Sequence, residues 1–173
     1  PFTGWDNRLG EPVGIAVPTA GSGDFRVPAL VVEQPDGSGV LDLVYVGHRI
    51  VAGKPAIDPH PATYAESPDE AETVTITLAD RIAGLEVDLL LTIFRDVPAI
   101  ARSMAIRNVG AARLDVTTAM SWSLDLPDGD WRMVQLSGAW ARERHVHERA
   151  LVPGRHTIGS EDRKSTRLNS SHT

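Results

Sequence analysis

The sequence predicts an all-β protein, a twisted antiparallel β-sandwich. Short segments alternate apolar with polar residues, turn-forming residues separate them at regular spacing, and helical periodicity is scarce. Hairpin connections of this kind keep successive strands within one pair of sheets. The chain also lacks the alternation of strands and helices that is typical of nucleotide-binding folds.

The first two expected strands, residues 30–33 and 40–46, flank the segment Gln-Pro-Asp-Gly-Ser-Gly at 34–39. Proline, aspartate and glycine favour a turn there. In 40–46 the valines and Asp42 share one face and Leu41, Leu43 and Tyr45 the other. The proline-rich stretch 54–68 is expected to be a loop.

The middle of the chain gives the clearest strand pattern. In residues 72–78 three threonines alternate with valine, isoleucine and leucine, which predicts a half-buried strand. A turn at 80–84 leads into a second strand, 85–94. One face of that strand carries Leu85, Val87, Leu89, Leu91 and Ile93.

The last two expected strands cover residues 100–108 and 114–126, with a turn at Asn-Val-Gly between them. Trp122 and Trp131 are expected to pack in the core or between sheets. Two glycine-containing stretches do not alternate cleanly, one at 4–8 with 21–26 and one at 136–145. Loops of this type are where a β scaffold displays function.

The composition excludes several function classes. The formal net charge is −6, so no basic surface is available to collect phosphates and nucleic acid is not expected as a partner. The chain contains no cysteine, which excludes disulfides and thiolate metal sites and is compatible with a cytoplasmic location. No apolar stretch approaches the length of a membrane span, so no membrane partner is expected.

Paired charges in the two unusual stretches allow a structural and a functional interpretation. We expect Asp24 and Arg26 to fix a turn or an interface rather than to touch substrate. Trp140 with Arg142 and Arg144 could form a sugar platform, but an aromatic ring flanked by arginines is more typical of a domain or subunit interface with cation–π contacts.

A histidine pair, His145 and His147, would place both rings on one face of a strand. A metal site needs at least a third ligand, and the sequence offers none at suitable spacing. We therefore expect no metal and no cofactor.

Several collinear segments resemble the N-terminal domain of family 36 glycoside hydrolases, the α-galactosidases. Examples are Gly-Asp-Phe-Arg-Val-Pro-Ala and Leu-Ser-Gly-Ala-Trp-Ala-Arg-Glu-Arg. The resemblance extends from Trp5 to Ser160. The segments that carry it are 23–29, 48–50, 53–55, 61–64, 70–73, 84–87, 100–103 and 136–144.

The resemblance implies a β-sandwich that precedes a (β/α)8 barrel and a small C-terminal β domain. Members are retaining enzymes that release terminal α-linked galactose with two barrel aspartates, so no residue of this chain is expected to be catalytic. It also implies a homo-oligomer in which N-domain loops approach the active-site mouth. Arg8 resembles a loop arginine placed there, and Trp5 could stack on a sugar ring.

The end of the chain is expected to be foreign. Residues 162–172 resemble, codon by codon, the translation of a common short-read sequencing adapter. The domain is therefore expected to cover residues 1–161, cut at both ends, with 162–173 non-native and disordered. Without that tail, 14 basic and 22 acidic residues leave a net charge of about −8. The alternative is a natural disordered tail rich in serine and arginine.

Two functions follow from these observations. The first is the N-terminal domain of a retaining α-galactosidase, inactive without its barrel. The second is a non-catalytic β-sandwich module that binds carbohydrate or another protein.

Overall fold

The structure is a computed structural model that describes residues 17–21, 27–57, 62–124, 126, 129–139 and 141–159. The chain divides into two compact units, Pro1–Asp125 and Leu126–Thr173, which we describe separately. The described elements are β1 (Leu30–Glu33), β2 (Val44–Ala52), η1 (Pro68–Glu70), β3 (Ala71–Asp80), β4 (Leu85–Phe94), β5 (Ile100–Asn108), β6 (Asp115–Ala119), β7 (Arg132–Ala139) and β8 (Arg142–Ala150).

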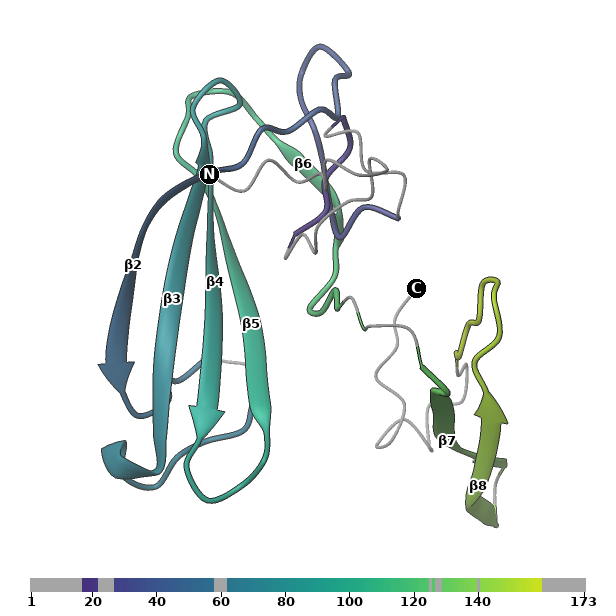
Figure 1. Cartoon of the computed structure of the whole chain (residues 1–173). Coiled ribbons are helices and arrows are strands. Elements are labelled where there is room, and N and C mark those ends of the chain that lie inside the picture. Colours follow the sequence, from purple (N-terminus) through teal and green to yellow (C-terminus); the bar gives the residue numbers. More distant parts are fainter. Residues whose placement is uncertain are drawn as a thin grey trace. The chain divides into compact units, whose positions relative to one another are not determined.

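The first unit is built on a four-stranded antiparallel sheet in the order β2-β3-β4-β5 (Figure 1). Strands β3 and β4 pair over their full lengths, from Ala71 opposite Phe94 to Asp80 opposite Leu85. The tight turn between them requires Gly84, which has a φ of +69°. A Cβ on Gly84 would also lie 2.7 Å from the Cα of Gly110, so the two turns at this end of the sheet are in backbone contact.

A smaller second layer packs on one face of this sheet and creates the core. Strands β1 and β6 pair antiparallel, with a register shift between Val31 and Val32. Leu30 and Val32 are fully buried against the start of β4, as expected for a sandwich whose inner faces interdigitate. The buried cluster consists of Val17, Leu30, Val32, Leu41, Ala83, Leu85, Val87 and Leu89. The predicted all-β sandwich is confirmed.

The second layer is shorter than the sheet beneath it. The exposed fraction of the side chains along β4 therefore rises from 1% at Leu85 to 58% at Ile93, although both side chains lie on the same face. The neighbouring strands expose Ile50 and Ile100 at the same end of that face. The inner face is thus a packed core at the Leu85 end and an exposed apolar surface at the Ile93 end.

The second unit contains the antiparallel hairpin β7-β8. A register shift between Ser137 and Ala139 marks a bulge at Gly138, where a Cβ would collide with the backbone of Arg142 and Glu143. Every residue of β8 is exposed. Among the described residues of this unit, β7 and β8 pair only with each other.

Several sequence expectations need correction. The strand expected at 40–46 instead starts at Val44 and continues to Ala52, and the one expected at 114–126 is only the five-residue β6. Residues 136–145 lie mostly in the hairpin rather than in a loop. Trp122 and Trp131 are 41% and 43% exposed, so neither is a core residue, whereas Trp122 does pack against Arg102 of strand β5.

Substitution of Leu30 by alanine should lower the free energy of unfolding by about 2–5 kcal/mol, because the buried side chain of β1 would leave a cavity over β4. Urea unfolding followed by circular dichroism measures this loss. Ile82→Ala is the matched control, since Ile82 is 97% exposed and its loss should change stability by less than about 0.5 kcal/mol. Equal effects of the two changes would contradict the assignment of this core.

Candidate functional site

Most of the sequence-predicted site residues lie outside the described part of the chain. Trp5, Arg8, Asp24, Arg26 and Trp140 all belong to this group. Their expected roles in sugar binding or at an interface therefore remain predictions.

Arg142 and Arg144 are described, and both are exposed on β8. Arg144 and the preceding Ala141 have a φ of 63°, a left-handed conformation that is uncommon for residues other than glycine. The chain therefore turns sharply on either side of Arg142. These two arginines lie on an exposed strand, and their expected role at an interface remains a prediction.

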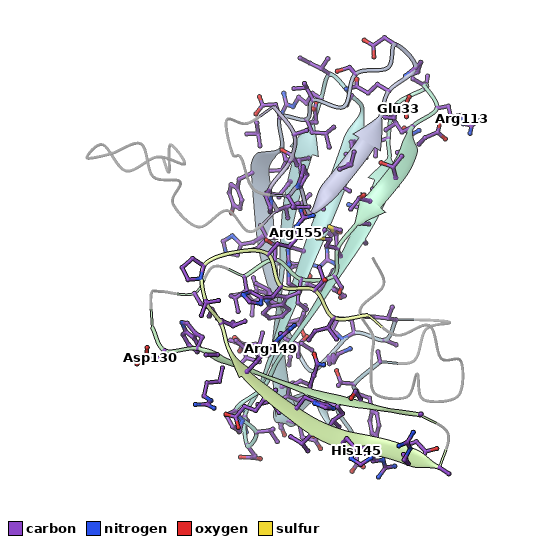
Figure 2. All side chains as sticks on the ribbon, turned by 90° about the vertical axis from the view of Figure 1, so that its right-hand side faces the viewer. Glu33, Arg113, Asp130, His145, Arg149 and Arg155 are labelled. Carbon is purple, nitrogen blue, oxygen red and sulfur yellow. The ribbon has the colours of Figure 1, made fainter. Side chains whose placement is uncertain are left out.

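The histidine pair also lies on β8. His145, which Figure 2 labels, is paired with Ser137, and His147 is paired with Gln135. Both histidines are exposed, as is Arg149 further along the strand. Among the residues that the structure describes, no group of three His, Cys, Asp or Glu side chains could hold a metal ion.

Sequence reasoning missed a charged cluster on the outer face of the four-stranded sheet. Arg107 Nη1 donates to Asp88 Oδ2 at 2.7 Å, and Arg107 Nη2 donates to Glu86 Oε2 at 3.1 Å. Thr77 Oγ1 donates to the other oxygen of Asp88 at 2.6 Å. The cross-strand register brings these side chains together from β3, β4 and β5, and sequence spacing alone does not reveal it.

The cluster keeps Asp88 ionised. The hydrogen bond from Arg107 lowers the pKa of Asp88 and outweighs burial, which acts in the opposite direction; Thr77 lowers the pKa further. A general acid needs a pKa raised toward neutrality, so Asp88 is unsuited to proton donation. Its role is to join three strands.

Asp80 has a comparable structural role at the end of β3. Burial would raise its pKa, but the backbone N–H groups of Ala83, Asp42 and Ile82 donate to the carboxylate and lower it overall. The carboxylate thereby fixes the β3–β4 turn and ties it to the segment that precedes β2. Asp80 and Asp88 are the buried carboxylates of the described residues.

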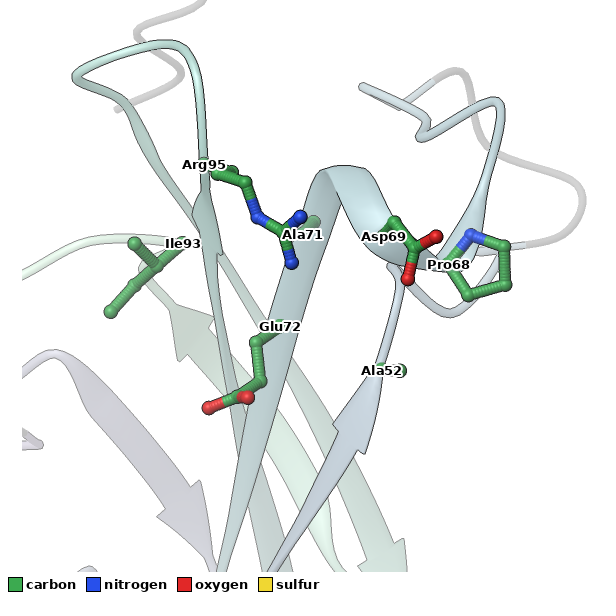
Figure 3. A pocket seen from close by; sticks show the side chains of 7 residues that line it. All are labelled: Ala52, Pro68, Asp69, Ala71, Glu72, Ile93 and Arg95. Carbon is green, nitrogen blue, oxygen red and sulfur yellow. The ribbon is translucent and has the colours of Figure 1, made fainter.

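An open pocket lies at the opposite end of the sheet, next to η1 (Figure 3). Its volume is about 330 Å³. The lining residues are Ala52, Pro68, Asp69, Ala71, Glu72, Ile93 and Arg95. It offers two carboxylates and one guanidinium over an apolar floor, and it contains no aromatic ring on which a sugar could stack.

Trp122 forms a cation–π pair with Arg102 that the sequence analysis did not identify. The guanidinium carbon of Arg102 lies 5.8 Å from the centroid of the Trp122 ring, a cation–π distance. Arg102 Nη1 also donates to the carbonyl oxygen of Ser121 at 3.4 Å. This pair fixes the segment that leaves β6 against β5.

Asp88→Asn should lower the free energy of unfolding at pH 7 by about 1.5–3 kcal/mol, the range for a hydrogen bond to a charged group. Because the folded-state pKa of Asp88 is depressed, its contribution is complete above the ordinary pKa of about 4 and is lost as the pH falls through the folded-state pKa. Urea unfolding between pH 7 and pH 2 should therefore show the two proteins converge in acid.

Asp115→Asn is the control, because Asp115 pairs with Arg113 at an exposed site and such a pair contributes little. Its effect should stay within about 0.5 kcal/mol at every pH. A constant difference for Asp88→Asn from pH 7 to pH 2 would contradict the role given to the carboxylate.

Comparison with known proteins identifies the domain. The family described as "Glycosyl hydrolase family 36 N-terminal domain" matches residues 10–172. α-Galactosidase AgaA of Geobacillus stearothermophilus is 45% identical over 137 residues, which cover 79% of this chain and 19% of the relative. α-Galactosidase 1 of Pediococcus pentosaceus is 40% identical over 142 residues, covering 82% and 19%.

Comparison with solved structures also finds α-galactosidases of glycoside hydrolase family 36. The crystal structure of the Geobacillus stearothermophilus enzyme matches with a TM-score of 0.77 and covers 80% of this chain and 19% of that one. The galactosidase domain of the α-galactosidase–sucrose kinase AgaSK has the same TM-score at 29% identity, covering 88% and 22%. The chain spans about a fifth of the length of these relatives. The family match and the shared β-sandwich show that the chain belongs to glycoside hydrolase family 36. It is similar to the N-terminal domain of that family along most of its length.

Proposed function

We propose that this chain is part of the N-terminal β domain of a retaining α-galactosidase and has a non-catalytic role. The observation that carries the proposal is the family match over residues 10–172, together with a span of only about a fifth of each relative. The complete protein would hydrolyse terminal α-linked galactose. The domain would supply scaffold, subunit contacts and one rim of the sugar site.

The chemistry of the buried carboxylates supports a non-catalytic role. Retaining glycosidases use one carboxylate as nucleophile and a second carboxyl group as acid and base, about 5–5.5 Å apart. Asp80 and Asp88 both have lowered pKa values, and hydrogen bonds within the sheet occupy both. Neither is free to protonate a leaving group.

Raffinose-type sugars are the substrate class that we propose for the complete enzyme. The AgaA relative has been crystallised with raffinose and with stachyose. Within this chain we propose Arg8 and Trp5 for the rim of the sugar site. For contacts with the barrel or a neighbouring subunit of a homo-oligomer we propose Trp140, Arg142, Arg144, Asp24 and Arg26.

Two further features complete this proposal. Among the described residues no helix is long and apolar enough to cross a membrane. The cysteine-free sequence is compatible with a reducing compartment, and we propose a cytoplasmic location. For residues 162–173, outside the described part of the chain, we retain the proposal of a non-native adapter translation.

A stand-alone carbohydrate-binding module is the second candidate. The open pocket next to η1 favours it, because Asp69, Glu72 and Arg95 could donate to and accept from sugar hydroxyls. The absence of an aromatic ring from the pocket lining argues against tight binding.

Calorimetric titration of the chain with raffinose separates the two candidates. The scaffold role predicts no saturable heat up to about 10 mM sugar, because a rim alone gives few contacts. Sucrose, which lacks the galactosyl group, is the matched control ligand. Saturable binding of raffinose but not sucrose, abolished by Glu72→Gln, would overturn the scaffold role in favour of the binding module.

A further inference from the structure

Two buried threonine hydroxyls form a hydrogen-bonded chain that ends on a backbone carbonyl group. Thr73 on β3 and Thr92 on β4 face each other across paired strands and are 0% and 3% exposed. Thr73 Oγ1 donates to the carbonyl oxygen of Gly53 at 2.8 Å, and the two hydroxyl oxygens lie 2.7 Å apart. Gly53 is buried as well, so this chain satisfies polar groups that are shielded from water.

The direction of these hydrogen bonds follows from the number of protons. A threonine hydroxyl donates one hydrogen bond and can accept others. The proton of Thr73 is directed to Gly53, so Thr92 donates to Thr73. Removal of the Thr73 hydroxyl would therefore deprive the Gly53 carbonyl of this donor and the Thr92 hydroxyl of this acceptor. Removal of the Thr92 hydroxyl would leave the bond from Thr73 to Gly53 in place.

Gly53 is the residue at which the chain leaves β2. Its N–H donates to the carbonyl oxygen of Ala71 at 2.7 Å, so β3 binds both the N–H and the C=O group of Gly53. Its φ of +77° turns the chain out of the extended conformation. Residues 53–67 then join β2 to η1, whereas about two to five residues commonly join antiparallel neighbours. Gly53 is therefore the anchored start of a long connection.

The other end of this connection lies against the first. A Cβ on Gly53 would lie 3.3 Å from the Cα of Pro68, which begins η1. The N–H of Arg95 fixes η1 by donating to the carbonyl oxygen of Glu70 at 2.9 Å. Ala52 and Pro68 line the pocket next to η1 (Figure 3). The place at which Gly53 is held therefore sets the separation of two walls of this pocket.

We propose that the hydroxyls of Thr73 and Thr92 act as a clamp that holds the start of the 53–67 connection and thereby the shape of the pocket. Thr73 is the positioning residue of this clamp, and Thr92 supports it as a donor. The clamp is built from buried groups within the sheet, so it acts whichever ligand the pocket takes. It adds a conformational role to the scaffold role proposed above.

A third threonine provides a matched comparison. Thr75 lies two residues further along the same face of β3 and is 1% exposed. Its hydroxyl has no hydrogen-bond partner among the residues that the structure describes. Thr73→Val and Thr75→Val are thus the same chemical change at nearly equal burial. The first breaks the clamp, and the second removes a hydroxyl that satisfies no other group.

Amide hydrogen exchange of the isotope-labelled chain, followed by NMR, tests the clamp through the Gly53 N–H. Thr73→Val should accelerate exchange of this amide at least about fivefold relative to the Leu89 amide in the core, because buried groups that lose their partners favour local opening. Leu89 reports opening of the whole sheet, so the ratio separates a local effect from a general loss of stability. Thr75→Val should leave the ratio within about twofold of the unmodified chain. Thr73→Ser keeps the hydroxyl and should behave like Thr75→Val.

Thr92 gives a second test, which depends on the direction of the hydrogen bonds. Thr92→Val alone should change the ratio by less than about twofold, because the bond from Thr73 to Gly53 remains. The double change should exchange no faster than Thr73→Val alone, since it also removes the donor that has lost its acceptor. Equal exchange of Gly53 and Leu89 in Thr73→Val, equal acceleration by Thr75→Val, loss of protection in Thr73→Ser, or a larger effect of Thr92→Val than of Thr73→Val would overturn the proposal.

Discussion

The contact between β1 and the start of β4 is the constraint on which the first unit depends. Leu30 and Val32 cover Leu85 and Val87, and all four side chains are almost fully buried. Burial of apolar surface is the main favourable term in folding, and in this unit the described buried cluster forms where the two layers overlap. The sheet itself supplies hydrogen bonds, but it becomes a stable element only because a second layer covers one end of one face.

The buried carboxylates among the described residues of this unit hold strands and turns together. Asp80 closes the β3–β4 turn, and Asp88 joins β3 and β4 to Arg107 on β5. A buried carboxylate is tolerated only when donors compensate for its lost hydration. The same donors lower the pKa, so the compensation that makes burial possible also removes proton-transfer capacity.

The boundaries of β1, β4 and β5 coincide with the expected strands 30–33, 85–94 and 100–108. Turn-forming residues flank these segments, and in β4 the alternation reflects the buried face of Leu85, Val87 and Leu89. The second half of β2 and all of β8 are exposed on both faces, so their residues are free to be glycine, histidine or arginine and no period appears. The Arg107 cluster was equally invisible, because it depends on which residues face each other across strands. The family assignment came from collinear segments, several of them in turns and strand ends.

The two faces of the four-stranded sheet differ at the end that the second layer leaves uncovered. The outer face carries polar cross-strand contacts such as that between Asp88 and Arg107, although within the described part of the chain the Thr75 hydroxyl is buried there without a hydrogen-bond partner. The inner face near Ile93 and the edge at Ile50 expose apolar side chains, and the edge also leaves backbone groups without a strand partner among the described residues. Apolar area and unpaired backbone groups both favour contact with another chain segment. The surfaces of this unit that suit assembly therefore lie at the Ala52 and Ile93 end, whereas the Leu85 end contains the core that holds the unit together.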